Sequence, residues 1–180
     1  MNVVRESFKT VSDELAKERN RMAVPRLERV VVNVGTGSRK DDKAYKEMVT
    51  ESLVKITGQK PAITTARTSI AGFKLREGQE IGAKVTIRGR RMEDFFYRLV
   101  HIALPRVRDF RGISPKGFDG HGNFSLGLRE HTVFPEVSAE DISQAHPLGI
   151  TIVTTTDDDA EAFDLLKRLG FPFAEGRPGK

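Results

Sequence analysis

The side chains that enzymes use as nucleophiles, proton carriers or metal ligands are scarce in this sequence. Cysteine is absent, which excludes thiol catalysis, thiolate metal sites and disulfide bonds. None of the four histidines stands four residues from another, and neither a His-Glu-x-x-His zinc motif nor a Gly-x-Ser-x-Gly nucleophile elbow occurs. The histidines are His101, His121, His131 and His146. We therefore expect no catalytic constellation, no metal and no other cofactor.

Two short motifs resemble ligand sites but have simpler explanations. The glycines at 35 and 37 lack the third glycine of a dinucleotide-binding loop, since position 40 is lysine, and they lack P-loop spacing. The run Asp157–Asp159 would attract a cation, but acidic residues also stabilise the positive N-terminal end of a helix. We interpret the first motif as a turn and the second as a helix start with Asp157 as the cap. An enzyme acting on a nucleotide or on RNA is the weaker alternative, and a nucleotide turnover assay would detect it.

Positive charge is concentrated in the middle of the chain. Residues 60–116 hold 13 Lys/Arg against 5 Asp/Glu, whereas residues 135–180 hold 4 against 9. A basic body with an acidic C-terminal end indicates a polyanionic partner such as RNA. Ordinary surface charge, or a protein-only adaptor that uses the acidic end, remains an alternative. The sequence has neither an apolar run of about 18 residues nor an apolar signal core, which predicts a cytoplasmic protein without a membrane span.

Alternating and helical hydrophobic patterns indicate a mixed fold. Strands are expected at 27–34, 62–65, 82–88, 123–130 and 148–156, and helices at 3–19, 42–57, 92–104 and 158–169. Clean alternation in the strands means that one sheet face is buried and the other is wet. The predicted class is α+β, with an antiparallel or mixed sheet, helices packed on one face and the opposite face open. We expect one domain over residues 1–180, with long loops at about 71–79 and 108–123.

The expected open face carries side chains suited to RNA. If the valines of the first strand and the apolar residues of the third pack on helices, their polar neighbours point outward. Those neighbours are Arg29, Asn33, Lys84, Thr86 and Arg88. Arginine offers a planar fork for phosphate, and asparagine and threonine can reach 2′-hydroxyl groups. A solvated face with cross-strand polar pairs explains the same pattern, so both interpretations stay open here.

The two predicted loops mix aromatic and basic residues. Phe73 neighbours Lys74 and Arg76 in the first, and Phe110 and Phe118 lie in the second. The basic residues of the second loop are Arg106, Arg108, Arg111 and Lys116. Exposed aromatic rings beside arginine would form a stacking surface for splayed bases. Alternatively, the phenylalanines anchor the loops to the core.

Three long segments resemble a known family. VPRLERVVVNVGTG, GQKPAITTARTSIAGFKLREGQEIGAKVTIRG and RDFRGISPKGFDGHGNFSLGLREHTVFPE are similar to the bacterial-type large-subunit ribosomal protein L-five family, over roughly residues 24–173. The resemblance implies an antiparallel sheet with helices on one face. It also implies binding of 5S rRNA in the central protuberance, beside neighbouring 5S-associated proteins. Further implied contacts are with the peptidyl-site tRNA and, as an intersubunit bridge, with a small-subunit head protein.

The resemblance also assigns roles to residues. The 5S rRNA contacts of the family fall on Asn33, Gln59, Thr86 and Arg88, to which the expected open face adds Arg29 and Lys84. The tRNA-contacting loop is similar to residues 71–78, with Phe73, Lys74, Leu75 and Arg76 as contacts. The bridge contact falls in 108–123 or 136–146. Thr65 departs from the family, in which many members have a basic residue, so a phosphate contact is expected to be lost there.

Overall fold

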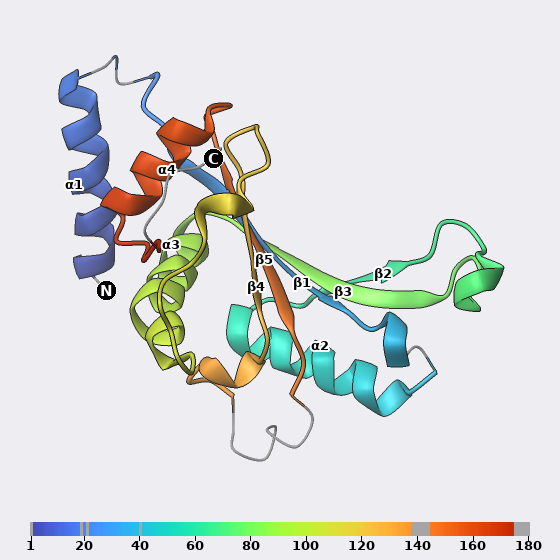
Figure 1. Ribbon diagram of the computed structural model, residues 1–180. Helices are drawn as coiled ribbons and strands as arrows, with labels where there is room; N and C mark the ends of the chain where they lie inside the picture. The colour runs from blue at the N-terminus through green and yellow to red at the C-terminus, as the bar shows by residue number, and fades with distance from the viewer. Residues whose placement is uncertain (1, 19, 21, 40, 138–144, 175–180) are drawn as a thin grey trace. The chain divides into compact units, whose positions relative to one another are not determined.

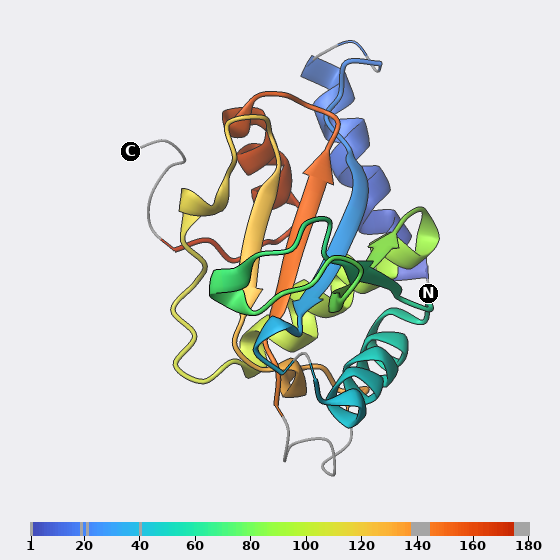
Figure 2. The same cartoon turned by 90° about the vertical axis from the view of Figure 1, so that its right-hand side faces the viewer.

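A five-stranded sheet is the central element of this computed structural model, which describes residues 2–18, 20, 22–39, 41–137 and 145–174 (Figure 1). The strands are β1 (Leu27–Gly35), β2 (Ala62–Thr65), β3 (Glu80–Ile87), β4 (Phe124–Leu128) and β5 (Leu148–Thr154). Their order is β2-β3-β1-β5-β4, and Figure 2 shows β4, β5 and β1 side by side. The sheet is antiparallel, which narrows the prediction of an antiparallel or mixed sheet and confirms the α+β class.

The chain divides into two compact units. Unit 1 contains Met1–Val30, Ile87–Leu126 and Thr151–Lys180, and unit 2 contains Val31–Thr86 and Gly127–Ile150. The expectation that residues 1–180 act as one domain stays a prediction. In the part of the chain that the structure describes, no helix is both long enough and apolar enough to cross a membrane.

The described residues of unit 1 form three α-helices, and aromatic side chains fill much of the core of this unit. The helices are α1 (Asn2–Glu18), α3 (Arg90–Arg98) and α4 (Asp159–Arg168). Phe96 packs edge-on against Phe8 of α1 at 5.7 Å between ring centroids and lies 6.2 Å from Phe171. Phe124 of β4 meets Phe171 edge-on at 5.3 Å. Burying each such side chain contributes about 1.5–3 kcal/mol to the stability of the fold.

The helix predicted at 92–104 is longer and less regular than expected. After α3 the chain continues as a π-helical turn (Leu99–Ala103) and then a 3-10 turn (Leu104–Arg106). The Leu104 N–H donates to the Leu99 carbonyl, five residues back. Proline has no N–H and clashes with the carbonyl four residues earlier, so regular α-helix cannot continue through Pro105. Pro105 therefore lies inside a tighter turn instead of following the end of the helix.

The cap of α4 differs from the prediction by one residue. Asp158, not Asp157, is the N-cap, because its carboxylate accepts a hydrogen bond from the Ala160 N–H at 2.9 Å. The predicted end of the helix is confirmed. Gly170 adopts a left-handed conformation (φ 84°), and its N–H donates to the Lys167 carbonyl at 3.0 Å.

In unit 2, helix α2 (Lys43–Thr57) lies along one side of the strands (Figure 1). It begins at the N-cap Asp42, whose carboxylate accepts from the Tyr45 N–H at 3.1 Å. It ends at Gly58, which is left-handed as expected of a C-terminal glycine (φ 66°). Its apolar stripe is buried; the buried residues of α2 are Tyr45, Val49, Ser52, Leu53, Ile56 and Thr57. This helix therefore covers one face of the sheet in its unit.

The cap of α4 can be tested with neighbouring aspartates. We expect Asp158→Ala to lower the free energy of unfolding by about 1 kcal/mol, because a helix N–H loses its acceptor. The matched control Asp157→Ala, at an exposed residue, should cost less than half of that. Chemical denaturation of both variants measures the difference. Equal losses, or a larger loss for Asp157→Ala, would contradict the assignment of the cap.

Candidate nucleic-acid interface

Strand alternation in unit 2 produces the buried and exposed faces that the sequence predicts. Val32 and Val34 of β1 are at most 3% exposed, and Val85 of β3 is 2% exposed. Asn33 and Lys84 are exposed and Thr86 is half-buried; these three residues form what we call the polar face of unit 2. Because β1 and β3 are neighbours in the sheet, the polar face is a continuous surface of amide, ammonium and hydroxyl groups.

Gln59 is placed next to this face by the end of α2. Its side-chain nitrogen donates to the Thr86 carbonyl at 3.3 Å. The Thr57 hydroxyl accepts from the Gln59 N–H at 3.3 Å while it also donates to the Leu53 carbonyl at 2.6 Å. The left-handed turn at Gly58 makes this return of the chain possible. The structure thus brings together Gln59 and Thr86, which are far apart in the sequence.

Asn33 is positioned by a residue that sequence reasoning missed. A Cβ atom at Gly149 of β5 would lie 2.5 Å from the Asn33 side-chain oxygen, closer than any real Cβ contact. Asn33 therefore occupies the space that a side chain at 149 would fill. Glycine inside a strand costs stability, and it often marks such a close approach. That general rule was the only sequence signal for the role of Gly149.

Two of the predicted contacts, Arg29 and Arg88, belong to unit 1. Arg29 is half-buried and forms an ion pair with the adjacent Glu28. Arg88 is exposed and directly follows β3, before the left-handed Gly89 (φ 59°) that precedes α3. Both guanidinium groups can bind phosphate by their geometry, although the pair with Glu28 competes for Arg29. In its own unit, Arg88 is therefore the more accessible of the two.

The loop that joins β2 to β3 in unit 2 is a closed, hydrogen-bonded structure. Ala66 and Gln79 close its base with an N–H to carbonyl bond of 2.9 Å. Nearer the tip, Ile70 and Leu75 exchange two backbone hydrogen bonds of 3.0 and 3.1 Å. A 3-10 turn (Ala71–Phe73) precedes Lys74, which has a positive φ of 50°. The tip of the loop is therefore an ordered turn held by backbone hydrogen bonds.

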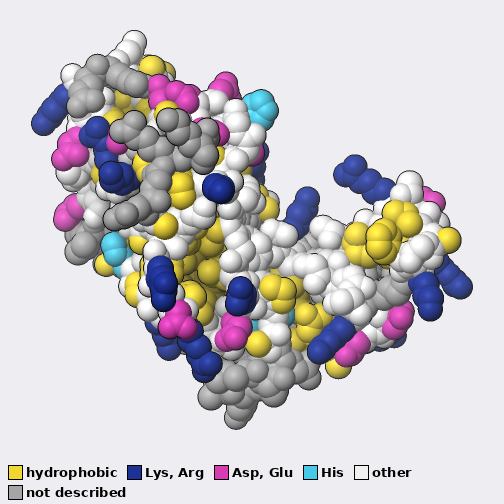
Figure 3. Space-filling model, viewed as in Figure 1, with side chains coloured by type: hydrophobic (Ala, Val, Ile, Leu, Met, Phe, Trp, Pro, Cys, Tyr) yellow, Lys and Arg dark blue, Asp and Glu magenta, His cyan; other side chains and the backbone are white. Residues whose placement is uncertain are grey.

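Hydrophobic and basic side chains gather at the tip of this loop. Phe73 is 76% exposed and Ile70 is 44% exposed, values far above those of core residues. Lys74 and Arg76 are exposed, and Leu75 is half-buried. Figure 3 shows an apolar patch flanked by Lys and Arg side chains at the end of this extension. For Phe73, the structure therefore excludes the alternative of a core anchor.

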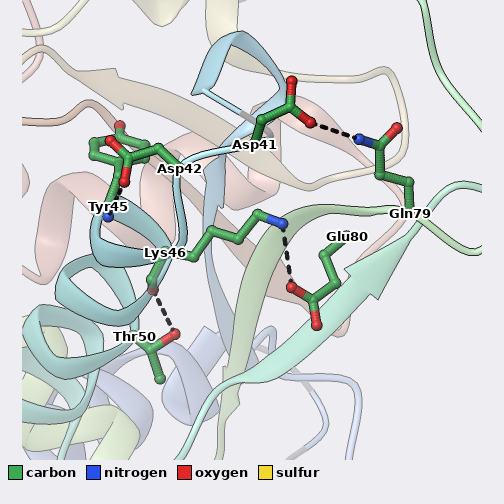
Figure 4. A network of polar contacts seen from close by, with 7 residues as sticks. All are labelled: Asp41, Asp42, Tyr45, Lys46, Thr50, Gln79 and Glu80. Carbon is green, nitrogen blue, oxygen red and sulfur yellow. Dashed lines mark hydrogen bonds and ion pairs between the residues drawn. The ribbon is translucent and has the colours of Figure 1, made fainter.

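Polar contacts brace the base of the loop against the start of α2 (Figure 4). Lys46 forms an ion pair with Glu80 at 3.2 Å, and the Gln79 amide donates to the Asp41 carboxylate at 3.4 Å. The Gln79 side-chain oxygen accepts from the Arg76 N–H at 3.3 Å. Exposed contacts of this kind contribute little energy singly. Together they restrict the directions in which the loop can point.

The second predicted loop, in unit 1, has an aromatic anchor. Phe118 packs against Phe124 at 4.8 Å between ring centroids, so for this residue the anchoring alternative is correct. The Asp159 carboxylate accepts from the N–H groups of Gly120 and Gly122 at 3.0 and 2.8 Å. Hydrogen bonds from Asn123 lower the pKa of Asp119 in the same turn. The acidic residues here serve the loop and the helix start.

The fold and the exposed groups define a class of protein. It is an α+β protein with an amide-rich polar face and a basic loop with an exposed aromatic tip. Among the residues that the structure describes, no group of three or more His, Cys, Asp or Glu side chains is arranged to hold a metal ion.

Comparison with known proteins identifies the family of this chain. Residues 20–76 match the family described as "Ribosomal protein L5", and residues 80–173 match the model of the C-terminal part of the same ribosomal family. "Large ribosomal subunit protein uL5" of Halothermothrix orenii is 51% identical over 178 residues, covering 96% of this chain and 99% of the relative. The relative of the same name from Helicobacter pylori is 49% identical over 170 residues, covering 93% and 94%. The chain belongs to the ribosomal protein L5 family, and it is a ribosomal protein and not an enzyme.

The packing of Asn33 over Gly149 leads to a structural prediction. Gly149→Ala should force the Asn33 side chain to rotate, because the new Cβ would overlap its oxygen. The side-chain amide signals of Asn33 in a nitrogen–proton correlation spectrum should shift. The matched control is Gly127→Ala in β4, where a Cβ would meet nothing within 4 Å. Unchanged Asn33 signals in Gly149→Ala would show that the close approach does not hold in solution.

Proposed function

We propose that this chain is a structural constituent of the large ribosomal subunit that binds 5S rRNA and helps to attach it in the central protuberance. The observation that carries the proposal is the polar face of unit 2, with Gln59 bonded beside it. Membership of the family supports a ribosomal, and hence cytoplasmic, location. The specific RNA comes from the resemblance of the sequence to the family.

The groups on this face suit recognition of RNA shape. Asn33 and Gln59 offer amide donors and acceptors, and the Thr86 hydroxyl offers both; such groups bind 2′-hydroxyls and base edges. Lys84 adds positive charge for phosphates on this face, and Arg29 and Arg88 are proposed as phosphate contacts in unit 1. Strands and a helix end hold these groups, so little conformational entropy is lost on binding. Binding should weaken steeply as salt rises, because bound phosphates lose their counterions.

Arg88 provides the sharpest test of the 5S rRNA proposal. We expect Arg88→Ala to weaken 5S rRNA binding by about 1–3 kcal/mol, the range for a good polar contact to a nucleic acid. Filter binding at two or more salt concentrations measures both affinity and salt slope. The matched control is Arg168→Ala on α4, whose guanidinium is paired with Asp164 at 2.9 Å. If Arg88→Ala and Arg168→Ala bind equally well, Arg88 is not part of the interface.

We infer a second contact, with the peptidyl-site tRNA, through the loop between β2 and β3. An exposed aromatic ring can stack on a base, and neighbouring cations can neutralise the phosphate of that nucleotide. Phe73 supplies the ring, Lys74 and Arg76 supply the charges, and Leu75 lies between them. The closed base of the loop supports this role, because it holds the tip in one shape.

The two contacts should be separable by mutation. Replacing Phe73, Lys74 and Arg76 by alanine should leave 5S rRNA affinity and folding unchanged, because all three side chains are exposed. Loss of one stacked base costs about 1–3 kcal/mol, so peptidyl-site tRNA binding to reconstituted subunits should weaken by at least that amount. Loss of 5S rRNA binding in this variant would contradict the proposed separation of the two contacts.

Protein partners complete the proposal. Neighbouring 5S-associated proteins of the large subunit and a small-subunit head protein are the partners that the family resemblance implies. The intersubunit bridge would use the loop 108–123 or the stretch near 136–146. The Phe118 anchor and the Asp159 bonds support the first, since a braced loop suits a repeated contact. A protein-only adaptor remains the alternative, and co-sedimentation with large subunits that is lost on RNase treatment would argue against it.

A further inference from the structure

A buried pair of imidazoles lies in unit 2. His131 and His146 are both 0% exposed, and their rings stack with centroids 3.9 Å apart and planes 5° from parallel. Their spacing in the sequence predicted no relation between them. Histidine has an unperturbed pKa near neutrality, so a fully buried pair ties local structure to protonation state.

Hydrogen bonds make the pair a connection between chain segments. The His131 N–H donates to the His146 carbonyl at 3.1 Å, and the His146 N–H donates to Nδ1 of His131 at 3.2 Å. Nε2 of His146 lies 2.8 Å from the hydroxyl of Ser52 on α2. Ser52 is itself 2% exposed and donates to the Val49 carbonyl. The stretches 131–137 and 145–147 are thus joined to each other and to the helix.

Protonation of His131 disrupts this arrangement, and burial disfavours a charge on either ring. Nδ1 of His131 accepts a hydrogen bond, so a proton there would replace the acceptor with a second donor. A charge on either ring would also be buried and stacked against the other. Burial is the largest cause that lowers the pKa of His146 to about 4. A positive charge on His131 would act in the same direction, whereas the Pro147 carbonyl, 3.4 Å from Nδ1 of His146, acts in the opposite direction.

The charged residues that flank the pair on the packed elements are mostly exposed. On α2 they are Glu51 and Lys55, and around His131 they are Arg129, Glu130 and Glu136. All but the half-buried Glu136 lie in solvent, where their charges are screened. None of these five residues is among the groups that shift the pKa of His146, whereas His131 is.

We propose that Ser52, His131 and His146 form an acid-sensitive clasp, in which uptake of one proton releases the stretches 131–137 and 145–147 from α2. The clasp is independent of the proposed RNA contacts. The direction of its pH dependence follows from the lowered pKa of His146. The stabilisation is fully present above the ordinary pKa of 6.5 and is lost progressively as the pH falls towards about 4.

Hydrogen exchange of the purified full-length chain tests the clasp. Between pH 6.5 and 4, the opening constant of peptides from 131–137 should rise by about tenfold per pH unit, after correction for intrinsic exchange. Far-ultraviolet circular dichroism should stay constant over the upper part of this range. The double variant His131→Gln/His146→Gln keeps hydrogen-bonding groups but cannot titrate, so its opening constant should not change with pH. His121→Gln, at an exposed histidine, should behave like the wild type.

Two results would overturn the clasp. One is a parallel loss of protection in the wild type and the double variant. The other, which needs no variant and so remains decisive if the double variant fails to fold, comes from a proton titration of the histidine ring signals. If His146 titrates at its ordinary pKa while 131–137 stay protected, the ring is not held as the structure has it.

Discussion

Burial of one face of the sheet against α2 is the constraint on which the rest of unit 2 depends. Val32, Val34 and Val85 are at most 3% exposed, and the burial of each contributes about 1.5–3 kcal/mol. Since successive side chains of a strand alternate, their polar neighbours must then point the other way. A shift of one residue in register would bury Asn33 and Lys84 and expose the valines. The energy of the core thus determines the position of the candidate binding groups.

Local backbone features then position the polar side chains on the exposed face. The left-handed turn at Gly58 returns the chain so that Gln59 reaches Thr86, and Gly149 leaves the space that Asn33 occupies. In the loop between β2 and β3, two backbone hydrogen bonds between Ile70 and Leu75 hold the tip in shape. Phe73, at this tip, is exposed and not part of the core. Phe73 and Ile70 are both exposed at this tip, and exposed apolar patches often mark interaction sites.

Periodicity predicted the features that depend on neighbours in sequence. The alternation of β1 and β3 correctly separated buried from exposed residues, and Gly58 and Gly170 correctly ended their helices. The role of Gln59 came from the family resemblance alone. The mixture of aromatic and basic residues singled out the loop tip as a stacking surface, and the resemblance added tRNA as its partner. The structure places Gln59 beside Thr86 and Phe73 at the exposed loop tip, and the contact of these residues with RNA stays a prediction.

Features that depend on distant contacts escaped prediction. Gly149 matters only because Asn33 lies over it, and His131 meets His146 only when the chain has folded. Asp158, and not Asp157, is the N-cap because of the backbone geometry at the start of the helix. The composition of this acidic run does not show which aspartate has that geometry. The π-helical turn before Pro105 is likewise a local adjustment to a missing donor and a steric clash.

The central claim is that 5S rRNA binds the sheet face opposite α2. A density map of the large ribosomal subunit containing this chain, at a resolution that shows side chains, tests it most directly. The account predicts 5S rRNA density within hydrogen-bonding distance of Asn33, Gln59 and Thr86, with α2 directed away from that RNA. RNA packed along α2, or a polar face in contact only with solvent or protein, would contradict the account.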